Sequence, residues 1–324
     1  MKKISQLTSF DQIKVLADAN RQNLLRLLMA APATLTQLGK IVGETPAWVR
    51  HHVKLLESAG LIEISEIRTD GIVTEKYYRA KAGAFLVQEL ILPKSKKPVL
   101  VLSGSHDLAI EKLAGEMEEH IHILSMPVGS LDGLVNLRQG LCHVTGAHLL
   151  DSTGEYNTPF VRRLFPDRPI EMMTLAHRIQ GWIVSPGNPL DIRTATDLTR
   201  RDVKFVNRNL GSGTRLWLDA ELQRLGIPGS VIIGYDTIVT KHTQVARLIA
   251  RGEANVALGL EAAARRFGLD FVPLFSERYD LIFPKEYAES LSAVFDRLQS
   301  SAFRHELDEL SGYETAHTGE QIHP

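Results

Sequence analysis

Small polar residues stand at three places in this 324-residue chain where an apolar stretch gives way to an amphipathic one. The three groups are Ser103-Gly104-Ser105, Gly129-Ser130 and Gly211-Ser212-Gly213-Thr214. A strand followed by a helix at each place gathers free N–H groups and hydroxyls at a helix N-terminus, where the helix dipole favours negative charge. Glycine lets the backbone approach a ligand closely. The junctions therefore predict a site for an anion.

Arg208 and Arg215 flank the third group and add positive charge to it. Simple helix capping explains any one junction equally well, but three junctions in one domain favour a ligand site. Asp107 and Asp132 lie close to the expected anion and would repel it unless they are paired or turned away. The expected ligand contacts are Ser103, Ser105, Ser130, Arg208, Ser212, Gly213, Thr214, Arg215 and Tyr235. Further residues that fit the cleft and a packed or surface position equally well are His106, His148, Tyr156 and His242.

Strands that alternate with helices must position these junctions. Predicted strands lie within residues 98–107, 120–130, 141–150, 203–208, 231–236, 254–260 and 270–284. This alternation indicates a parallel sheet with its ligand site outside the carboxyl ends of the strands. The chain contains neither G-x-G-x-x-G nor G-x-x-x-x-G-K-[ST], and no G-x-S-x-G, so no nucleotide or hydrolase motif is present.

The first third of the chain has a different pattern. Apolar spacing predicts one helix over residues 9–32, a short helix over 34–42 and a third over 45–59, with Thr45 as its N-cap. Residues 61–80 alternate apolar and polar on both sides of Asp70-Gly71, which predicts a hairpin. Helix, short helix, turn, helix and hairpin make a winged helix-turn-helix.

Charge is divided unevenly between the two parts. Residues 1–97 hold 15 Lys and Arg against 9 Asp and Glu, whereas the remainder holds 22 against 29. Random scatter explains this as well as function does, but a basic first part suits contact with nucleic acid. We expect base or phosphate contacts from the third helix and the wing. The candidate residues are Thr45, Ala47, Arg50, His51, Lys54, Arg68 and Lys76.

Residues 84–92, AFLVQELIL, are strongly apolar, and we expect a helix there that pairs two subunits. The expected division of the chain is a DNA-binding domain at 1–92, a linker at 93–98, a ligand-sensing domain at 99–316 and a tail at 317–324.

Composition excludes several classes of protein. No apolar run is long enough to span a membrane, and no secretory signal stands at the start, which favours the cytoplasm. The single cysteine, Cys142, excludes an intramolecular disulfide and a cysteine cluster for zinc. We expect no metal site and no cofactor.

Longer sequence segments of this chain resemble those of two known protein families. LADANR, VRHHVKLLESAGLI and EKYYRA resemble the ArsR-like family of bacterial transcriptional regulators over residues 10–82. That resemblance implies a DNA-binding dimer with residues 45–59 in the major groove. The cysteines and His/Asp clusters of the metal-sensing members are missing from residues 1–90.

From Val99 to about Ala316 the chain resembles the periplasmic-binding-protein-like domain that is fused to bacterial regulators, on phrases such as SGSHDLA, QGWIVSPGNP and ERYDLIFP. The spacing of Arg208, Ser212, Gly213 and Thr214 is similar to the anion-binding segment of tungstate receptors. The resemblance implies two α/β lobes that close on a ligand, joined by crossing strands at 180–189 and 277–284.

The sequence therefore predicts a DNA-binding homodimer, not an enzyme, that senses a small anion, with molybdate or tungstate first. An organic anion such as a pterin-type cofactor precursor is the alternative. An enzyme and a solute receptor for transport remain as other classes. Against them stand the lack of a visible nucleophile–base pair and the DNA-binding head.

Overall fold

The computed structural model describes residues 4–7, 9–71, 73–87 and 90–324. The chain divides into two compact units, Met1–Ile91 and Leu92–Pro324, and each unit has a hydrophobic core of its own. Among the described residues, no helix is long and apolar enough to cross a membrane.

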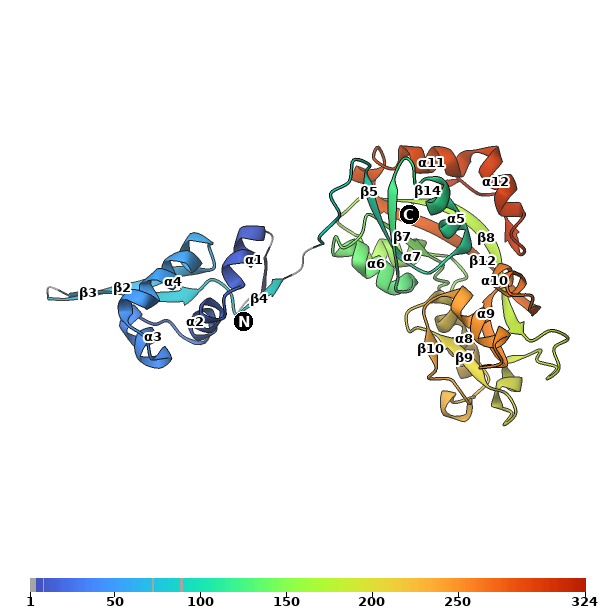
Figure 1. Ribbon diagram of the computed structural model, residues 1–324, viewed down its shortest axis with the longest axis horizontal. Coiled ribbons are helices and arrows are strands. Elements are labelled where there is room, and N and C mark those ends of the chain that lie inside the picture. Colours follow the sequence, from blue (N-terminus) through green and yellow to red (C-terminus); the bar gives the residue numbers. More distant parts are fainter. Residues whose placement is uncertain (1–3, 8, 72, 88–89) are drawn as a thin grey trace. The chain divides into compact units, whose positions relative to one another are not determined.

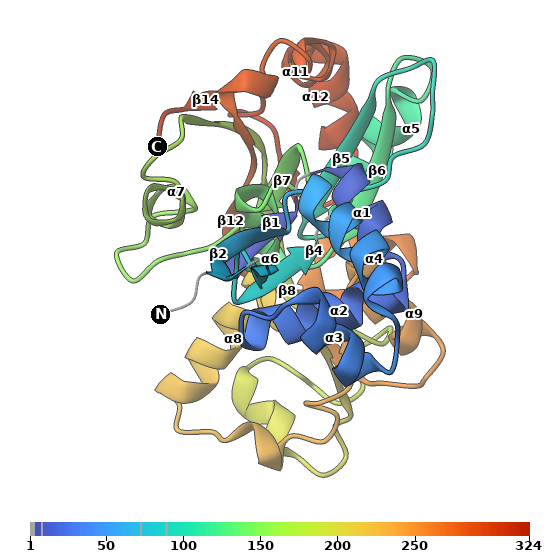
Figure 2. The ribbon, with the colours of Figure 1, turned by 90° about the vertical axis from the view of Figure 1, so that its left-hand side faces the viewer.

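The N-terminal unit is a helix-turn-helix followed by a hairpin. Thr34 and Gln37 form a capping box at the start of α3, and Gly43 ends that helix with φ 76°. The Thr45 hydroxyl accepts a hydrogen bond from Trp48 N at the start of α4. Figure 2 shows α2, α3 and α4 packed against one another. The elements are β1 (Ile4–Leu7), α1 (Phe10–Leu16), α2 (Ala19–Ala30), α3 (Leu35–Val42), α4 (Pro46–Ser58), β2 (Ile62–Asp70), β3 (Val73–Ala80) and β4 (Ala84–Val87).

Two of the helix predictions for this unit are wrong. The helix expected over 9–32 is two helices, because Asp18 adopts an extended backbone and caps α2 by accepting from Arg21 N. The helix expected over 84–92 is absent: Ala84–Val87 forms β4, which pairs in parallel with β1. Residues 88–89 of that prediction lie outside the described residues, and 90–92 have no regular structure. The partner strand, which is far away in sequence, decides the conformation of this apolar segment.

The C-terminal unit is an α/β fold built on one large sheet of order β10-β9-β11-β8-β12-β7-β5-β6, with β13 and β14 paired to β8. The strands are β5 (Val99–Gly104), β6 (His122–Pro127), β7 (Val144–Ala147), β8 (Ile170–Val184), β9 (Phe205–Arg208), β10 (Ile238–Val239), β11 (Val256–Leu260), β12 (Asp270–Pro284), β13 (Tyr313–Glu314) and β14 (Gln321–Ile322). The helices are α5 (Leu108–Glu116), α6 (Ser130–Arg138), α7 (Thr158–Leu164), η1 (Ala195–Thr199), α8 (Gly213–Arg224), η2 (Gly229–Val231), α9 (His242–Ala250), α10 (Glu261–Arg266), η3 (Lys285–Tyr287), α11 (Ser292–Gln299) and α12 (Ser301–Asp308).

Two long antiparallel strands join the two lobes of this unit. β8 and β12 each have 15 residues and pair along nearly their whole length. β5, β6 and β7 with α5 and α6 form the first lobe, and β9, β10 and β11 with α8 and α9 form the second (Figure 1). The crossings expected at 180–189 and 277–284 fall partly on β8 and wholly on β12. The two-lobed α/β expectation is thus confirmed.

The strand expected over 231–236 is wrong. Residues 229–231 form η2, and Gly234 has φ 90° in a turn that leads to β10. A side chain on Gly234 would lie 2.0 Å from the Phe205 carbonyl oxygen, so only glycine permits this close approach to β9. The segment contacts β9 without forming a strand: Phe205 N donates to the Ile233 carbonyl at 2.8 Å, and the Asn207 amide donates to the Tyr235 carbonyl at 3.0 Å.

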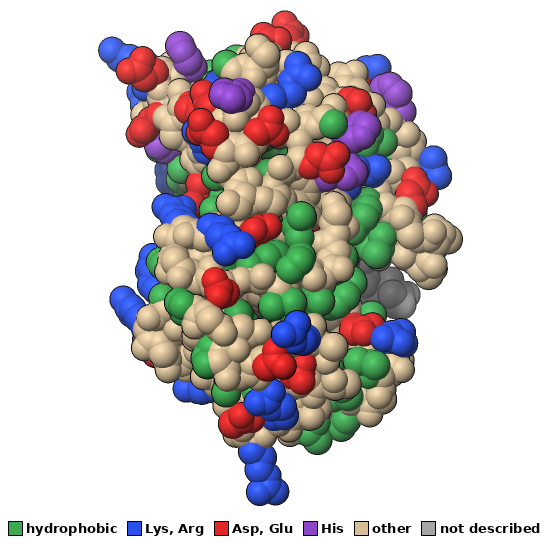
Figure 3. Space-filling model, turned by 90° about the vertical axis from the view of Figure 1, so that its right-hand side faces the viewer, with side chains coloured by type: hydrophobic (Ala, Val, Ile, Leu, Met, Phe, Trp, Pro, Cys, Tyr) green, Lys and Arg blue, Asp and Glu red, His purple; other side chains and the backbone are tan. Residues whose placement is uncertain are grey.

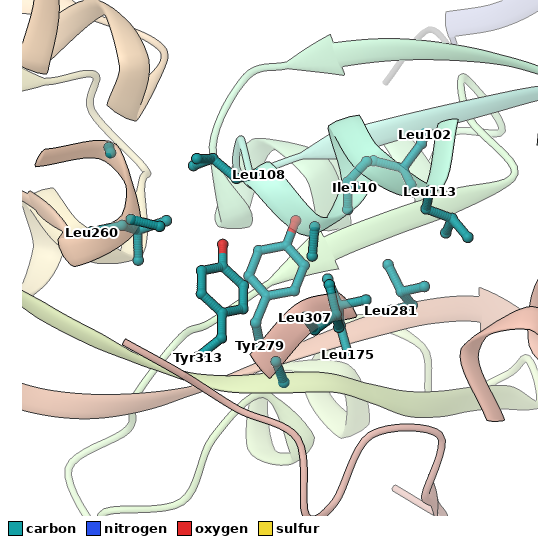
Figure 4. Close-up of a cluster of buried hydrophobic side chains, with 14 of the residues drawn as sticks. Leu102, Leu108, Ile110, Leu113, Leu175, Leu260, Tyr279, Leu281, Leu307 and Tyr313 are labelled. Carbon is teal, nitrogen blue, oxygen red and sulfur yellow. The ribbon is translucent and has the colours of Figure 1, made fainter. Parts of the chain in front are cut away.

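A shared apolar cluster supports the first lobe and the crossing strands. It includes Leu102 and Leu113 of the first lobe together with Leu175 and Leu281 of the crossing strands. Figure 4 shows Tyr279 and Tyr313 side by side in this cluster, with both hydroxyls pointing the same way. Those hydroxyls meet the segment between β5 and α5: Tyr279 donates to the Ser105 carbonyl and Tyr313 to the Asp107 carboxylate, each at 2.6 Å.

Candidate functional site

The serines and threonine of the three junctions are all buried. Ser103 and Ser105 follow β5, Ser130 begins α6, and Ser212 and Thr214 lie at the start of α8. All five hydroxyls already have a hydrogen-bond partner within the protein: His148 N donates to the Ser130 hydroxyl, and the Ser105 and Thr214 hydroxyls contact His148 and Gln180. Ser103 accepts a hydrogen bond from the Asn136 amide, and Ser212 both caps α8 and donates to the Asn209 carbonyl. Capping is therefore the observed role of Ser212.

The two lobes touch where α6 and α8 begin. Leu131 N donates to the Gly211 carbonyl at 3.0 Å, and the Asn209 amide donates to the Val128 carbonyl at 2.5 Å. Gly129 has φ 104°, and a Cβ there would lie 2.9 Å from Ser212 N. The lobes are therefore closed on each other at this point, and a larger residue than glycine would keep them apart.

Polar side chains from both lobes and both crossing strands form what we call the buried polar cluster. Every member is at most 6% exposed. Hydrogen bonds run through it: His148 contacts the Ser105 hydroxyl at 2.9 Å, and the Gln180 amide donates to the Thr214 hydroxyl at 3.1 Å and to Glu277 at 2.9 Å. The cluster consists of Ser105, His106, Asp107, Ser130, His148, Arg178, Gln180, Arg208, Thr214, His242 and Glu277.

Arg178 is the compensated cation of this cluster. It lies opposite Glu277 in the register of β8 and β12, donates through Nε to Glu277 at 2.7 Å and forms an ion pair with Asp107. The Tyr279 ring lies 4.2 Å from its guanidinium carbon. Burial alone would raise the pKa of Glu277, but His148 and Arg178 beside it hold that pKa at about 2. Asp107 is thus paired, which removes the repulsion expected from the sequence, and Asp132 is exposed.

Arg208, at the end of β9, is the uncompensated cation. Its side chain is buried, and its Nη2 donates to the Thr240 carbonyl at 2.9 Å. Its Nε and Nη1 have no hydrogen-bond partner in the part of the chain that the structure describes. Burial and the neighbouring Arg178 lower the pKa of Arg208 to about 9. Because a buried charge without a partner is costly, this arrangement calls for an anion against Arg208.

Three histidines line the same region in their neutral form, because burial lowers the pKa of each. His148 bridges Glu277 and Ser105, and His106 contacts Glu111 at 2.9 Å through Nε2. Neither ring nitrogen of His242 has a partner among the described residues.

Two sequence candidates are engaged elsewhere. Arg215 forms an ion pair with Asp219 at 2.7 Å and stacks on the Tyr235 ring, whose hydroxyl also donates to Asp219. Arg215 and Tyr235 therefore form a group of their own beside α8. Figure 3 shows one face of the molecule, where side chains of both charges surround a band of hydrophobic ones.

Sequence reasoning missed Arg178, Gln180 and Glu277. A signal for the first two was present, since HRIQ places polar residues with a period of two inside an otherwise apolar strand, and such residues face one side of a sheet. No group of three or more His, Cys, Asp or Glu within the described ranges is arranged to hold a metal ion.

The residues expected to contact DNA lie on the surface of the N-terminal unit. Thr45, Ala47, Arg50, His51 and Lys54 are exposed on one side of α4, while its other side buries Val49, His52, Val53 and Leu56. In the hairpin, Lys76 is exposed, and Arg68 pairs with Glu66 at 2.8 Å and lies over the Tyr77 ring.

Two families match this chain. Residues 111–299 match the PBP superfamily domain, and residues 16–65 match a helix-turn-helix domain. The Bacillus subtilis (strain 168) "Uncharacterized protein YvgK" is 36% identical over 229 residues, which are 70% of this chain and 74% of that protein. A Clostridium pasteurianum protein, "Uncharacterized protein in ferredoxin 2Fe-2S gene 5'region", is 36% identical over 108 residues, 32% of this chain and 96% of its own length.

Among solved structures, a putative phosphate ABC transporter substrate-binding protein with bound phosphate from Clostridium perfringens has a TM-score of 0.49 at 16% identity, covering 67% of this chain and 99% of that chain. The substrate-binding domain of a putative molybdenum ABC transporter from Clostridium difficile has a TM-score of 0.42 at 15% identity, covering 68% and 100%. Because both scores are low, these likenesses carry no argument about the ligand.

Proposed function

Because this chain belongs to the PBP superfamily and carries a helix-turn-helix domain in residues 16–65, we propose that it is a transcriptional regulator whose DNA binding responds to a small anion. Its DNA-binding part is of the ArsR-like winged type, and it acts in the cytoplasm, where operator DNA is found. The protein binds its ligand without converting it.

The observation that carries this proposal is the state of Arg208. Among the described residues, Nε and Nη1 of this buried guanidinium have no hydrogen-bond partner, and an anion would supply acceptors for both. The Ser105 and Ser130 hydroxyls and the α8 N-terminus with Thr214 lie in the same buried polar cluster. An oxyanion has enough oxygens to use donors from both lobes, so its binding favours the closed arrangement.

Molybdate and tungstate are the first ligands to test, with sulfate and phosphate as competitors. A ligand that binds only the native state raises the melting temperature, so a thermal-shift screen of the four oxyanions identifies it. For the variant Arg208→Met, the matched control in this screen is Arg224→Met, which removes an exposed arginine of α8. No shift with any oxyanion would exclude an inorganic ligand.

An apolar pocket favours the organic-anion alternative as the second candidate. It has a volume of about 340 Å³ and shares His148, Gly213 and Glu277 with the region of the cluster. Its wall includes Trp217 and Phe275, whose rings stack 4.3 Å apart and suit a flat ligand. Pterins therefore belong in the same thermal-shift screen, and a shift with a pterin alone would favour this candidate.

The response must reach the DNA. We expect salt-dependent binding to an operator duplex, and a change in affinity when the ligand is added, because the ligand shifts the population of the closed form. Fluorescence anisotropy with and without the ligand measures both effects. A full-length protein that binds no duplex in either state would contradict the regulator proposal.

The regulator is further proposed to be a homodimer through its N-terminal unit. Phe10, Leu86, Val87 and Ile91 are large apolar side chains that are exposed in the single chain. An apolar hollow of about 410 Å³ between α1, α2 and β4 lies in the same unit. A two-fold arrangement covers such surfaces and matches a palindromic operator. Light scattering that shows only a 36.0 kDa species at micromolar concentration would contradict it.

A further inference from the structure

The charges of the buried polar cluster already balance before any ligand binds. Arg178 and Arg208 are cations, Asp107 and Glu277 are anions, and the three histidines are neutral. A doubly charged oxyanion placed against Arg208 therefore leaves two negative charges in excess, out of contact with water. Because such a buried excess is costly, the cluster has reason to take up a proton together with the ligand.

His242 is the side chain placed to take up that proton. It is the first residue of α9 and follows Thr240, whose carbonyl accepts from Arg208. The imidazole is fully buried, and within the described part of the chain neither of its nitrogens has a hydrogen-bond partner. A protonated imidazole offers two donors, and an oxyanion beside Arg208 supplies acceptors for them.

The other two histidines are less suited. His148 already uses both ring nitrogens, on Glu277 and Ser105. His106 uses Nε2 on Glu111, which is itself held by Arg266 at 3.1 Å. His242 alone of the three has both nitrogens open among the described residues, and its ring centre lies 6.2 Å from that of His106.

We propose that His242 contacts the bound anion and takes up one proton from solvent when a doubly charged oxyanion enters the cluster. This proposal rests on the proposed function, because it needs an anion at Arg208. It makes the affinity for the ligand fall as pH rises, so that the regulator reads acidity together with anion concentration.

The groups that face His242 agree with this role. Arg208 on β9 and Arg178 on β8 disfavour a charged imidazole in the ligand-free protein, and the neutral rings of His106 before α5 and His148 after β7 also face His242. The carboxylates nearby, Asp107 and Glu277, are held by Arg178. Burial and these neighbours keep the pKa of His242 well below 6.5 without ligand. An anion at Arg208 offsets the repulsion and raises it.

Calorimetry in buffers of different ionisation enthalpy counts the protons. At about pH 8 free histidines are neutral, and the probe is whichever of tungstate, molybdate, sulfate or phosphate binds in the thermal-shift screen. We expect uptake of about one proton by the wild type, and an affinity that falls about tenfold per pH unit between the ligand-free and the ligand-bound pKa of His242. His242→Gln, which keeps a donor and an acceptor, is expected to bind with uptake lowered by about one proton. His305→Gln, an exposed histidine of α12, is the matched control.

The outcomes separate the two proposals. Binding with equal proton uptake in the wild type and His242→Gln would overturn the role of His242 and leave the anion site standing. Absence of binding by all four oxyanions would overturn the inorganic-oxyanion form of the proposed function together with the role of His242. If His242→Gln does not bind, the imidazole signal of His242 in the wild-type NMR spectrum decides. A pKa raised by the anion supports the proposal, and an unchanged pKa overturns it.

Discussion

The two units of this protein use arginine in opposite ways. Arg50 and Arg68 of the N-terminal unit are exposed on α4 and in the hairpin, and water and salt screen their charge. Arg178 and Arg208 of the C-terminal unit are each 1% exposed, and neighbouring side chains set their state. An exposed cation keeps its charge without help and meets phosphates or bases. A buried cation needs a partner, and where the described residues supply none, as at Arg208, we propose that an anionic ligand does.

The strongest test of this contrast removes the compensated cation. Arg178→Met leaves Asp107 and Glu277 buried without their shared partner, and we expect a loss of about 3–5 kcal/mol in the free energy of unfolding. Arg68→Met breaks the exposed pair with Glu66 and is expected to cost at most about 1 kcal/mol. Urea denaturation measures both, and equal losses would end the contrast.

Removing Arg208, the uncompensated cation, is expected to affect ligand affinity rather than stability. Arg208→Met is expected to lower anion affinity by about a hundredfold or more, because two charge-assisted hydrogen bonds of about 1.5–3 kcal/mol each are lost. The ligand-free variant is expected to be as stable as the wild type or more stable, since an unpaired buried charge is gone. Calorimetry and melting temperatures test the two statements, and a strongly destabilised ligand-free variant would contradict the assignment of Arg208.

Substitutions on α4 test the exposed side of the comparison. Arg50→Ala is expected to reduce discrimination between operator and random DNA by about 1–3 kcal/mol if Arg50 reads a base. Lys54→Ala is expected to weaken all sequences alike and to lower the salt slope by about one unit, because it loses a phosphate contact. Arg224→Ala, at an exposed arginine of α8, is the control in anisotropy titrations. Unchanged binding by both variants would move the DNA contact away from α4.

The smallest effect concerns acidity. The pKa of His242 is well below 6.5 in the ligand-free folded protein, so below about pH 6.5 the unfolded chain takes up a proton that the folded protein does not. The free energy of unfolding is therefore unaffected by this histidine above that pH, and it falls by about 1.4 kcal/mol per pH unit below it for each such histidine. Melting temperatures of the ligand-free wild type and His242→Gln, measured from neutral to acid pH, are expected to diverge. If the melting temperatures of the two proteins change equally with pH, the neutral state of His242 in the folded protein is contradicted.

Local signals explain which elements the sequence predicted. Thr45 was predicted as the N-cap of the third helix, and the structure confirms it at the start of α4. The same kind of signal was available in Asp18, which caps α2 and divides the helix expected over 9–32. The predictions of a helix over residues 84–92 and of a strand over 231–236 were wrong, because contacts with β1 and β9, which lie elsewhere in the chain, decide the conformation of these segments.

The residues of the candidate site likewise include some that the sequence predicted and some that it did not. The small polar residues at strand ends pointed to the junctions, and the structure places Ser105, Ser130, Arg208 and Thr214 in one buried cluster. Whether these residues hold the ligand stays a prediction. The partners of Arg178 come from β12 and from the start of α5, so the pairing depends on a register that no local pattern shows.

The closed contact between the lobes has a consequence for timing. Two hydrogen bonds join the start of α6 to the loop before α8: Leu131 N donates to the Gly211 carbonyl, and the Asn209 amide donates to the Val128 carbonyl. The buried polar cluster lies behind this contact, and all its side chains are buried. A ligand leaves only after these bonds break and the lobes part, a movement of microseconds to milliseconds or slower. The residence time of the anion is then set by the rate of opening as well as by affinity. For the regulator that we propose, a brief drop in anion concentration would pass unnoticed, and only a sustained one would reset it.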